Sequence, residues 1–143
     1  MADRLRGEAD LVLFNERLTN SNVFGALFRE GMDLVEQTAA YLDGDGRAEA
    51  KALDRSASLT YATESMRLTT RLMQIASWLL LHRAANSGEM TRDQVATEKS
   101  KVRLDTASAQ ADVAGWAELP EAFRAIVTRS LRLQALVRRM DEE

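Results

Sequence analysis

The chain has 143 residues, of which 45% are hydrophobic and 29% charged, a composition that suits one globular domain. It contains no cysteine, so disulfides, thiolate chemistry and cysteine-ligated zinc are excluded. The formal net charge is −3, with basic and acidic residues interspersed, which favours neither nucleic acid nor an anionic membrane as a partner. No secretory signal is visible, and no apolar run approaches the roughly 20 residues of a membrane-spanning helix. A cytoplasmic location is therefore expected.

The first strong helical pattern covers residues 22–42, with apolar side chains on one half of the helix and charged ones on the other. Gly31 lies in the middle of the apolar half. A glycine in a helix costs roughly 0.5–1 kcal/mol relative to alanine, so its position predicts a close approach by a neighbouring helix. Residues 1–20 carry a mixed pattern, which is expected to give a short helix or an extended segment that is loosely packed or disordered.

The sequence DGDG at 43–46 is expected to end this helix. It also resembles the start of a calcium-binding loop. Counted from Asp43, however, the fifth position is Arg47 and the twelfth is Asp54, where such a loop needs an oxygen ligand and a glutamate. No metal site is therefore expected.

A second long helix is predicted from Arg47 or Asp54 to Ala85, where the sequence NSG ends it. Its apolar residues cover about half of its circumference, so it should touch two neighbouring helices as the centre of a bundle. One apolar sector contains Leu59, Ala62, Met66, Met73, Ala76 and Leu80, and the adjacent one contains Tyr61, Leu68, Leu72, Ile75 and Leu79.

Two further helices are predicted. Thr91 and Gln94 form a capping-box pattern that opens a shorter helix ending near Leu104. Residues 105–118 are expected to be a linker or a frayed helix, and Pro120 suits the first turn of a last helix that ends near Met140. The predicted fold is all-α, a single domain over residues 1–143 formed by an antiparallel three-helix bundle with one additional shorter helix.

The remaining face of the central helix raises the question of binding. Trp78 and Leu81 lie there among polar residues, with Arg71 and Gln74 close to them. Either another part of the chain covers these two apolar side chains, or the four residues form a partner-binding surface, because tryptophan and arginine are enriched at binding hot spots. The pattern leaves both interpretations open.

Residues that could support catalysis are scarce. The one histidine, His82, has Arg83 beside it and no acidic residue at helical spacing, and no glycine-rich phosphate loop occurs. The sequence therefore predicts no enzyme, no catalytic residue and no cofactor or metal site. Arginines are frequent in the last helix, but they face several directions without interleaved aromatic residues, so nucleic-acid binding is not expected.

Four segments together resemble a known family. They are FREGMDLVEQTAAYLDGDGR (28–47), LTYATESMRLTTRLMQIASWLLLHRA (59–84), GEMTRDQVATEKSKVRL (88–104) and LPEAFRAIVTRSLRLQALVRRMD (119–141). The chain resembles the "regulator of CtrA degradation" (RcdA) proteins of α-proteobacteria, and the match covers roughly residues 21–104 and 119–141.

This resemblance implies a non-enzymatic helical-bundle adaptor that delivers cell-cycle regulators to the protease ClpXP. The implied partners are ClpX together with a primed response-regulator-like adaptor, the cargo regulators, and a further adaptor that senses cyclic di-GMP. Self-association as a homodimer is also implied. The sequence ends soon after its last expected helix, so contacts made by a long C-terminal tail are not expected. An alternative is a helical-bundle regulator that binds nucleic acid or a small ligand.

Overall fold

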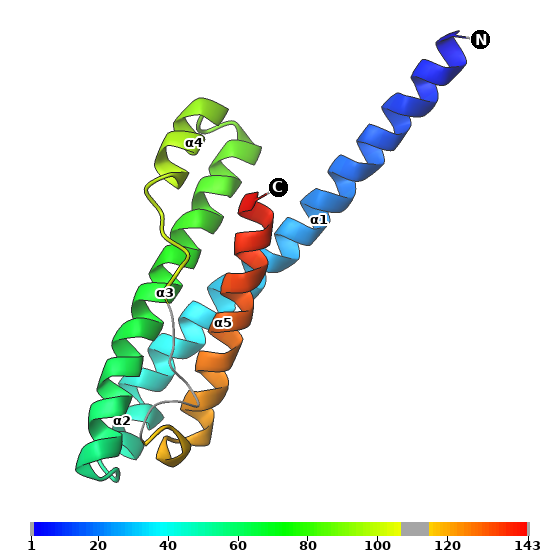
Figure 1. Cartoon of the computed structure of the whole chain (residues 1–143). Helices are drawn as coiled ribbons and strands as arrows, with labels where there is room; N and C mark the ends of the chain where they lie inside the picture. The colour runs from blue at the N-terminus through cyan, green and yellow to red at the C-terminus, as the bar shows by residue number, and fades with distance from the viewer. Residues whose placement is uncertain (1, 107–114, 143) are drawn as a thin grey trace. The chain divides into compact units, whose positions relative to one another are not determined.

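The computed structural model describes residues 2–106 and 115–142 (Figure 1), although within residues 2–20 it describes the side chains of Gly7 and Leu11 alone. The elements are α1 (Ala2–Asp43), α2 (Asp45–Ala50), α3 (Arg55–Ser87), α4 (Arg92–Lys99), the 3-10 helix η2 (Trp116–Glu118) and α5 (Glu121–Glu142). The chain divides into two units, Met1–Glu30 and Gly31–Glu143. Each unit is described by itself.

The unit Met1–Glu30 contains the first part of α1. Helix α1 begins at Ala2, so the prediction of a helix start near Asn22 is wrong. The polar sequence TNSN at 19–22 contains residues that cap helices well but neither proline nor glycine, and it follows a run rich in alanine, leucine, arginine and glutamate, which favour helix. The helix therefore continues through TNSN. The prediction that residues 1–20 are loosely packed or disordered concerns side chains that, apart from those of Gly7 and Leu11, lie outside the described residues.

The unit Gly31–Glu143 is a helical bundle formed by α3, α5 and the last part of α1 (Figure 1). Helix α1 ends at Asp43, as the DGDG sequence predicts, and the short α2 leads into α3. The side chain of Asp54 accepts a hydrogen bond from the Ala57 amide at 2.8 Å and caps the start of α3. Gly88, with φ of 77°, ends α3 in the left-handed conformation that glycine adopts most readily.

The directions of the three long helices differ in part from the prediction. The final segment of α1 runs antiparallel to α3 and to α5, because Gly31 lies near Leu79 and Leu133 whereas Tyr41 stacks on Phe123. Helices α3 and α5, in contrast, run parallel, since Arg71 contacts Ser130 and, further along both helices, Trp78 contacts Asp141. The all-α class is confirmed, but the antiparallel order holds only for α1.

The parallel arrangement requires a return segment, which we define as residues 88–120, between the end of α3 and the start of α5 (Figure 1). Its first part is α4, where Thr91 and Gln94 form the predicted capping box. Helix α4 ends at Lys99 rather than near Leu104, because the chain then turns, continues along α3 without regular secondary structure and buries Leu104. The predicted linker at 105–118 includes residues 107–114, which lie outside the described residues, and its last part forms η2.

The core of this unit lies where α3, α5 and the end of α1 meet. Its most deeply buried apolar side chains come from all three helices, and they are Leu34, Leu68, Ile75, Trp78, Leu79, Phe123, Val127, Leu133 and Val137. Tyr61 packs at 4.6 Å between ring centroids on Phe123, which stacks on Tyr41 from its other neighbour, α1. None of the helices in the described parts of the chain combines the length and apolar character needed to cross a bilayer.

Gly31 marks a close approach between helices, as its position predicts. A Cβ atom added there would lie 2.5 Å from Cδ1 of Leu79, a side chain with no exposed surface, and 3.7 Å from Cδ2 of Leu133. Because Leu79 is enclosed, it has little freedom to move away. The absence of a side chain at residue 31 therefore sets how closely α1 packs on α3.

Gly31→Leu is expected to lower the free energy of unfolding by about 1–3 kcal/mol, because the new side chain overpacks the contact with Leu79. Urea unfolding followed by circular dichroism measures the change. The matched control is Gly25→Ala, since a Cβ atom at Gly25 meets none of the described atoms within 4 Å. This control should gain roughly 0.5–1 kcal/mol from helix propensity. A stabilised Gly31→Leu variant would show that the contact has room to spare.

Candidate functional site

The four residues predicted to bind a partner follow one side of α3, and the structure places this side against the return segment and α5. Arg71 and Trp78 are buried, whereas Gln74 and Leu81 are partly exposed. They do not form an exposed patch. The structure thus agrees with the interpretation in which another part of the chain covers these side chains, and partner binding by the four residues stays a prediction.

Arg71 joins three segments of the chain. Its guanidinium has no exposed surface; Nε donates a hydrogen bond to the carbonyl oxygen of Thr106 at 3.2 Å, and Nη1 donates to Oγ of Ser130 on α5 at 2.9 Å. The third nitrogen, Nη2, is buried and has no hydrogen-bond partner among the described residues. Burial lowers the pKa of Arg71 from its ordinary value, and the buried Glu64 carboxylate on the same helix opposes this shift.

Thr106 takes part in three of the hydrogen bonds of this network. Its carbonyl oxygen also accepts from Nε2 of Gln134 at 3.3 Å, and its hydroxyl donates to Oε1 of Gln74 at 2.8 Å. One residue of the return segment is therefore bound by two side chains of α3 and one of α5. Because a buried polar group is costly when it lacks a partner, this network fixes the position of the chain at Thr106.

Trp78 lies at the centre of a second cluster, one that joins α3, α4 and the end of α5. Its indole nitrogen donates to Oδ1 of Asp141 at 2.8 Å, and its ring stacks on His82 with centroids 5.0 Å apart. Nζ of Lys99 lies 4.3 Å from the centroid of the indole ring and 2.9 Å from Nδ1 of His82. The ammonium group of Lys99 thus makes a cation–π contact with the face of the Trp78 ring.

The contact between Lys99 and His82 determines the form of the imidazole. An ammonium group has donors only, so Nδ1 of His82 accepts and the neutral ring carries its proton on Nε2. Burial lowers the pKa of His82, and the charge of Lys99 lowers it further. Burial also lowers the pKa of Lys99, while the Asp141 carboxylate opposes that shift.

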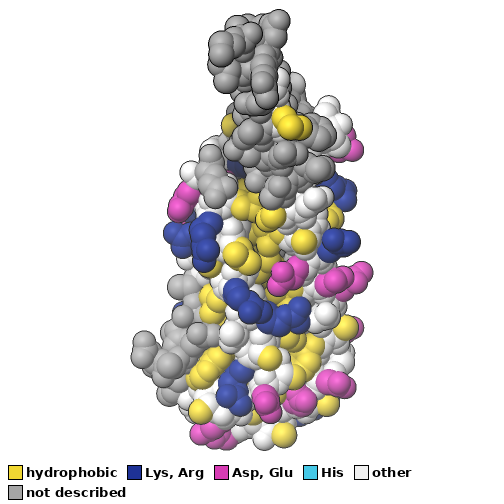
Figure 2. Space-filling model, turned by 90° about the vertical axis from the view of Figure 1, so that its right-hand side faces the viewer, with side chains coloured by type: hydrophobic (Ala, Val, Ile, Leu, Met, Phe, Trp, Pro, Cys, Tyr) yellow, Lys and Arg dark blue, Asp and Glu magenta, His cyan; other side chains and the backbone are white. Residues whose placement is uncertain are grey.

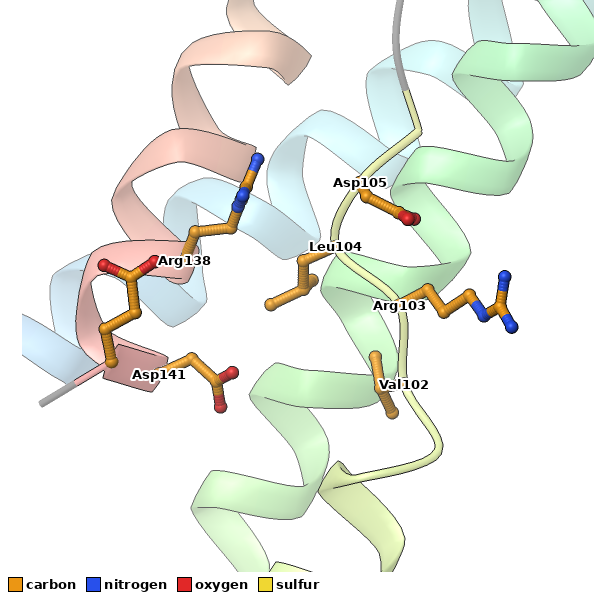
Figure 3. Close-up of a pocket in the computed structure, with 7 residues that line it drawn as sticks. Val102, Arg103, Leu104, Asp105, Arg138 and Asp141 are labelled. Carbon is orange, nitrogen blue, oxygen red and sulfur yellow. The ribbon is translucent and has the colours of Figure 1, made fainter.

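A pocket of about 290 Å³ lies beside this cluster, between the return segment and the end of α5 (Figure 3). In Figure 3 Leu104 points toward the space between the return segment and α5, while Arg103 points away from α5. The lining residues carry both signs of charge, and they are Val102, Arg103, Leu104, Asp105, Arg138, Asp141 and Glu142. The described residues contain no group of three or more metal-ligating side chains. We assign no catalytic or cofactor role to this pocket.

The opposite side of α3 differs from the prediction. The sequence predicts that the sector of the central helix with Leu59, Met66, Met73 and Leu80 touches a second neighbouring helix. These side chains are instead exposed, from 47% at Leu80 to 72% at Met66. The adjacent sector with Leu68, Leu72 and Leu79 is buried, and Leu79 faces Gly31 of α1. Sequence periodicity identifies an apolar sector but does not say whether a helix of the same chain covers it.

Charged side chains show no single-sign patch on the face drawn in Figure 2, where basic and acidic groups alternate around a band of hydrophobic side chains. Ion pairs join Arg67 with Glu64 and Lys101 with Glu98, each pair three residues apart in the chain and each at 3.1 Å. Strong electrostatic attraction of a nucleic acid needs a basic stripe or patch, and this face offers none.

These features define an all-α protein whose buried polar side chains hold its own segments together. The family model described as "Protein of unknown function (DUF1465)" matches residues 15–143, and the chain belongs to this family. The crystal structure of RcdA from Caulobacter crescentus CB15 matches with 49% sequence identity and a TM-score of 0.68. The match covers 82% of this chain and 87% of that one, so the chain is an RcdA-like protein and the resemblance is confirmed. A comparison with curated proteins finds no match.

Trp78→Ala is expected to lower the free energy of unfolding by about 3–5 kcal/mol, because it removes a side chain that is only 1% exposed. It also leaves Asp141 without its donor and Lys99 without its ring. The matched control is Arg132→Ala at an exposed position of α5, which should change stability by no more than about 0.5 kcal/mol. Equal unfolding midpoints for the two variants would contradict the buried position of Trp78.

Acid is expected to weaken the Trp78 cluster through His82. In the unfolded chain the imidazole has an ordinary pKa of about 6.5, and in the folded chain the pKa is lower, so the unfolded state binds more protons in this range. The stabilisation is therefore complete above about pH 6.5 and is lost as the pH falls toward the folded pKa. Urea unfolding at about pH 7.5 and 5.5 should show a larger loss of stability for the wild type than for His82→Gln. Since the chain has one histidine, an identical loss in both proteins would exclude His82 as the source.

Proposed function

We propose that the chain is a non-enzymatic adaptor that presents regulatory proteins to the ClpXP protease. The observation that carries this proposal is the 49% identity with RcdA over most of both chains. The segments that carry the resemblance, 28–47, 59–84, 88–104 and 119–141, include most of the helices that form the bundle. Identity at this level over 82% of the chain points to a shared mode of partner binding rather than to a shared fold alone.

The partners proposed on this basis are ClpX carrying a primed response-regulator-like adaptor, the cargo regulators, and an adaptor that senses cyclic di-GMP. Self-association as a homodimer belongs to the same proposal. The buried polar groups agree with a protein that does no chemistry, since Arg71, Gln74 and Trp78 bind other parts of the chain. No observation favours the alternative of a nucleic-acid or small-ligand regulator.

The proposal predicts faster proteolysis in a reconstituted reaction. ClpXP, the primed adaptor and a fluorescently labelled cargo regulator are mixed with increasing amounts of this protein, and the decay of the cargo is followed. We expect an increase in rate that saturates, because delivery requires a defined complex. RcdA from Caulobacter crescentus is the positive control, and omission of the primed adaptor is the negative one. If the control accelerates decay and this protein does not, the adaptor proposal fails.

A further inference from the structure

Lysine is rare in this chain, and one of its lysines lies in an environment that the others lack. The chain has three lysines, Lys51, Lys99 and Lys101. Lys51 and Lys101 are exposed, and Lys101 pairs with Glu98. Lys99, the last residue of α4, is partly buried and forms no ion pair with a carboxylate of the described residues. Its ammonium group is therefore held by a different kind of contact.

The nitrogen of Lys99 faces two rings of α3. Nζ lies 2.9 Å from Nδ1 of His82 and 4.3 Å from the centroid of the Trp78 ring. The two rings stack with an interplanar angle of 13°, which holds the imidazole in its orientation. Nδ1 of His82 is thus a fixed proton acceptor at hydrogen-bond distance from the lysine nitrogen. A positioned base of this kind is one of the arrangements that activate a nucleophile.

The surroundings of Lys99 favour the neutral amine over the ammonium ion. Burial lowers the pKa of Lys99, and the Asp141 carboxylate opposes this shift. That carboxylate, however, accepts its hydrogen bond from the indole of Trp78 and forms no ion pair with Lys99. An ammonium group that is partly removed from water without a paired carboxylate loses solvation that the contact with an aromatic ring replaces only in part. Partial desolvation is a recognised way to make a lysine nucleophilic.

Lys99 is also within reach of a reagent from solution. Its side chain is partly exposed, and the residues around it in the chain, Thr97, Ser100 and Lys101, are exposed. The end of α4 therefore lies at the surface of the unit Gly31–Glu143, while His82 and Trp78 lie on its inner side. Because the base lies beneath the lysine nitrogen, it leaves the outer side of that nitrogen open to an incoming group.

We propose that Lys99 is an acylation site, at which the nitrogen reacts with an acyl phosphate or an acyl thioester while His82 accepts its proton. One proton passes from Nζ to Nδ1 of His82, and the neutral amine attacks the acyl carbon. A carbon–nitrogen bond forms, and the bond from the acyl carbon to the phosphate oxygen or thioester sulfur breaks, with its electron pair leaving on that atom. The leaving group takes a second proton from the nitrogen, and His82 returns its proton to water. The products are an amide at Lys99 and free phosphate or thiol.

Acylation changes how α4 is held on α3. The amide carries no charge, so the cation–π contact with Trp78 is lost. Helix α4 keeps its other anchor, the buried side chain of Val95, but its last turn is released. Modification at this site therefore loosens α4 without altering the Arg71 network. This inference goes beyond the proposed function and does not depend on it.

Quantitative mass spectrometry of the three lysines tests the reactivity. The folded full-length protein is incubated with acetyl phosphate in one arm and with acetyl-coenzyme A in the other, and fragment spectra separate Lys99 from Lys101. In at least one arm Lys99 should be acetylated about tenfold faster than Lys51 and Lys101, because a positioned base accelerates proton removal. The faster arm identifies the donor class. In urea-unfolded protein the three rates should be equal. A Lys99 rate no higher than those of the two exposed lysines in both arms would overturn the proposal.

His82→Gln tests the proton acceptor. Glutamine offers an oxygen that accepts a hydrogen bond from Lys99, but its amide does not act as a base at neutral pH. The rate at Lys99 should fall to that of the exposed lysines, whereas the rates at Lys51 and Lys101 should stay as in the wild type. A cooperative unfolding transition of the variant shows that the loss does not come from a lost fold. An unchanged rate at Lys99 would remove His82 from the reaction.

Hydrogen exchange tests the consequence for α4. In protein acetylated at Lys99, the amides of α4 should exchange faster than in unmodified protein, whereas those of α3 and α5 in the core should not change. The matched control is Lys99→Arg, which keeps a positive charge over the Trp78 ring and lacks the amine, so its α4 should remain protected after the same treatment. Equal protection of α4 with and without the acetyl group would overturn the release of this helix. None of these measurements involves ClpXP, so their failure is distinguishable from a failed adaptor function.

Discussion

The buried guanidinium of Arg71 is the constraint on which the bundle's arrangement depends. Helices α3 and α5 can run parallel only if the chain returns along α3 before α5 begins, and Arg71 binds that return at Thr106 while binding α5 at Ser130. A charged group without exposed surface is tolerated when it is hydrogen-bonded, and here two of its three nitrogens are satisfied. A charge that is expensive to misplace thus selects the position of Thr106, since other positions would leave the guanidinium with fewer partners.

Helix α3 has two contrasting sides. Hydropathy alone indicates that the apolar side is buried and the polar side exposed, but the structure has the reverse. The side with arginine, glutamine and tryptophan lies inside, because the return segment and α5 supply a carbonyl, a hydroxyl and a carboxylate at matching positions. The side with leucine and methionine remains open. Polar groups thus specify which segments of this chain meet, whereas these exposed apolar side chains take no part in those contacts.

The sequence predicts much of the local structure and little of the site. The DGDG end of α1, the capping box at Thr91 and the contact at Gly31 rest on chemistry within a few residues or on one helix face, so they can be read directly. The hydrogen-bond partners of Arg71 and Trp78 are 35 to 63 residues away, at positions that follow no local pattern. The parallel order of α3 and α5 also escapes prediction, because short turns favour antiparallel neighbours and the length of the return segment alone does not fix its path.

The return segment has a consequence for how the bundle assembles. The end of α1 and α3 are joined by a short connection, so their contact requires little loop closure. Helix α5 reaches α3 only after the whole segment between Ser87 and Glu121 has been closed, and the hydrogen bond from Arg71 to Ser130 spans 59 residues. Loop-closure entropy opposes such distant contacts and slows their formation. We therefore expect the helical hairpin of α1 and α3 to form before α5 docks and completes the core.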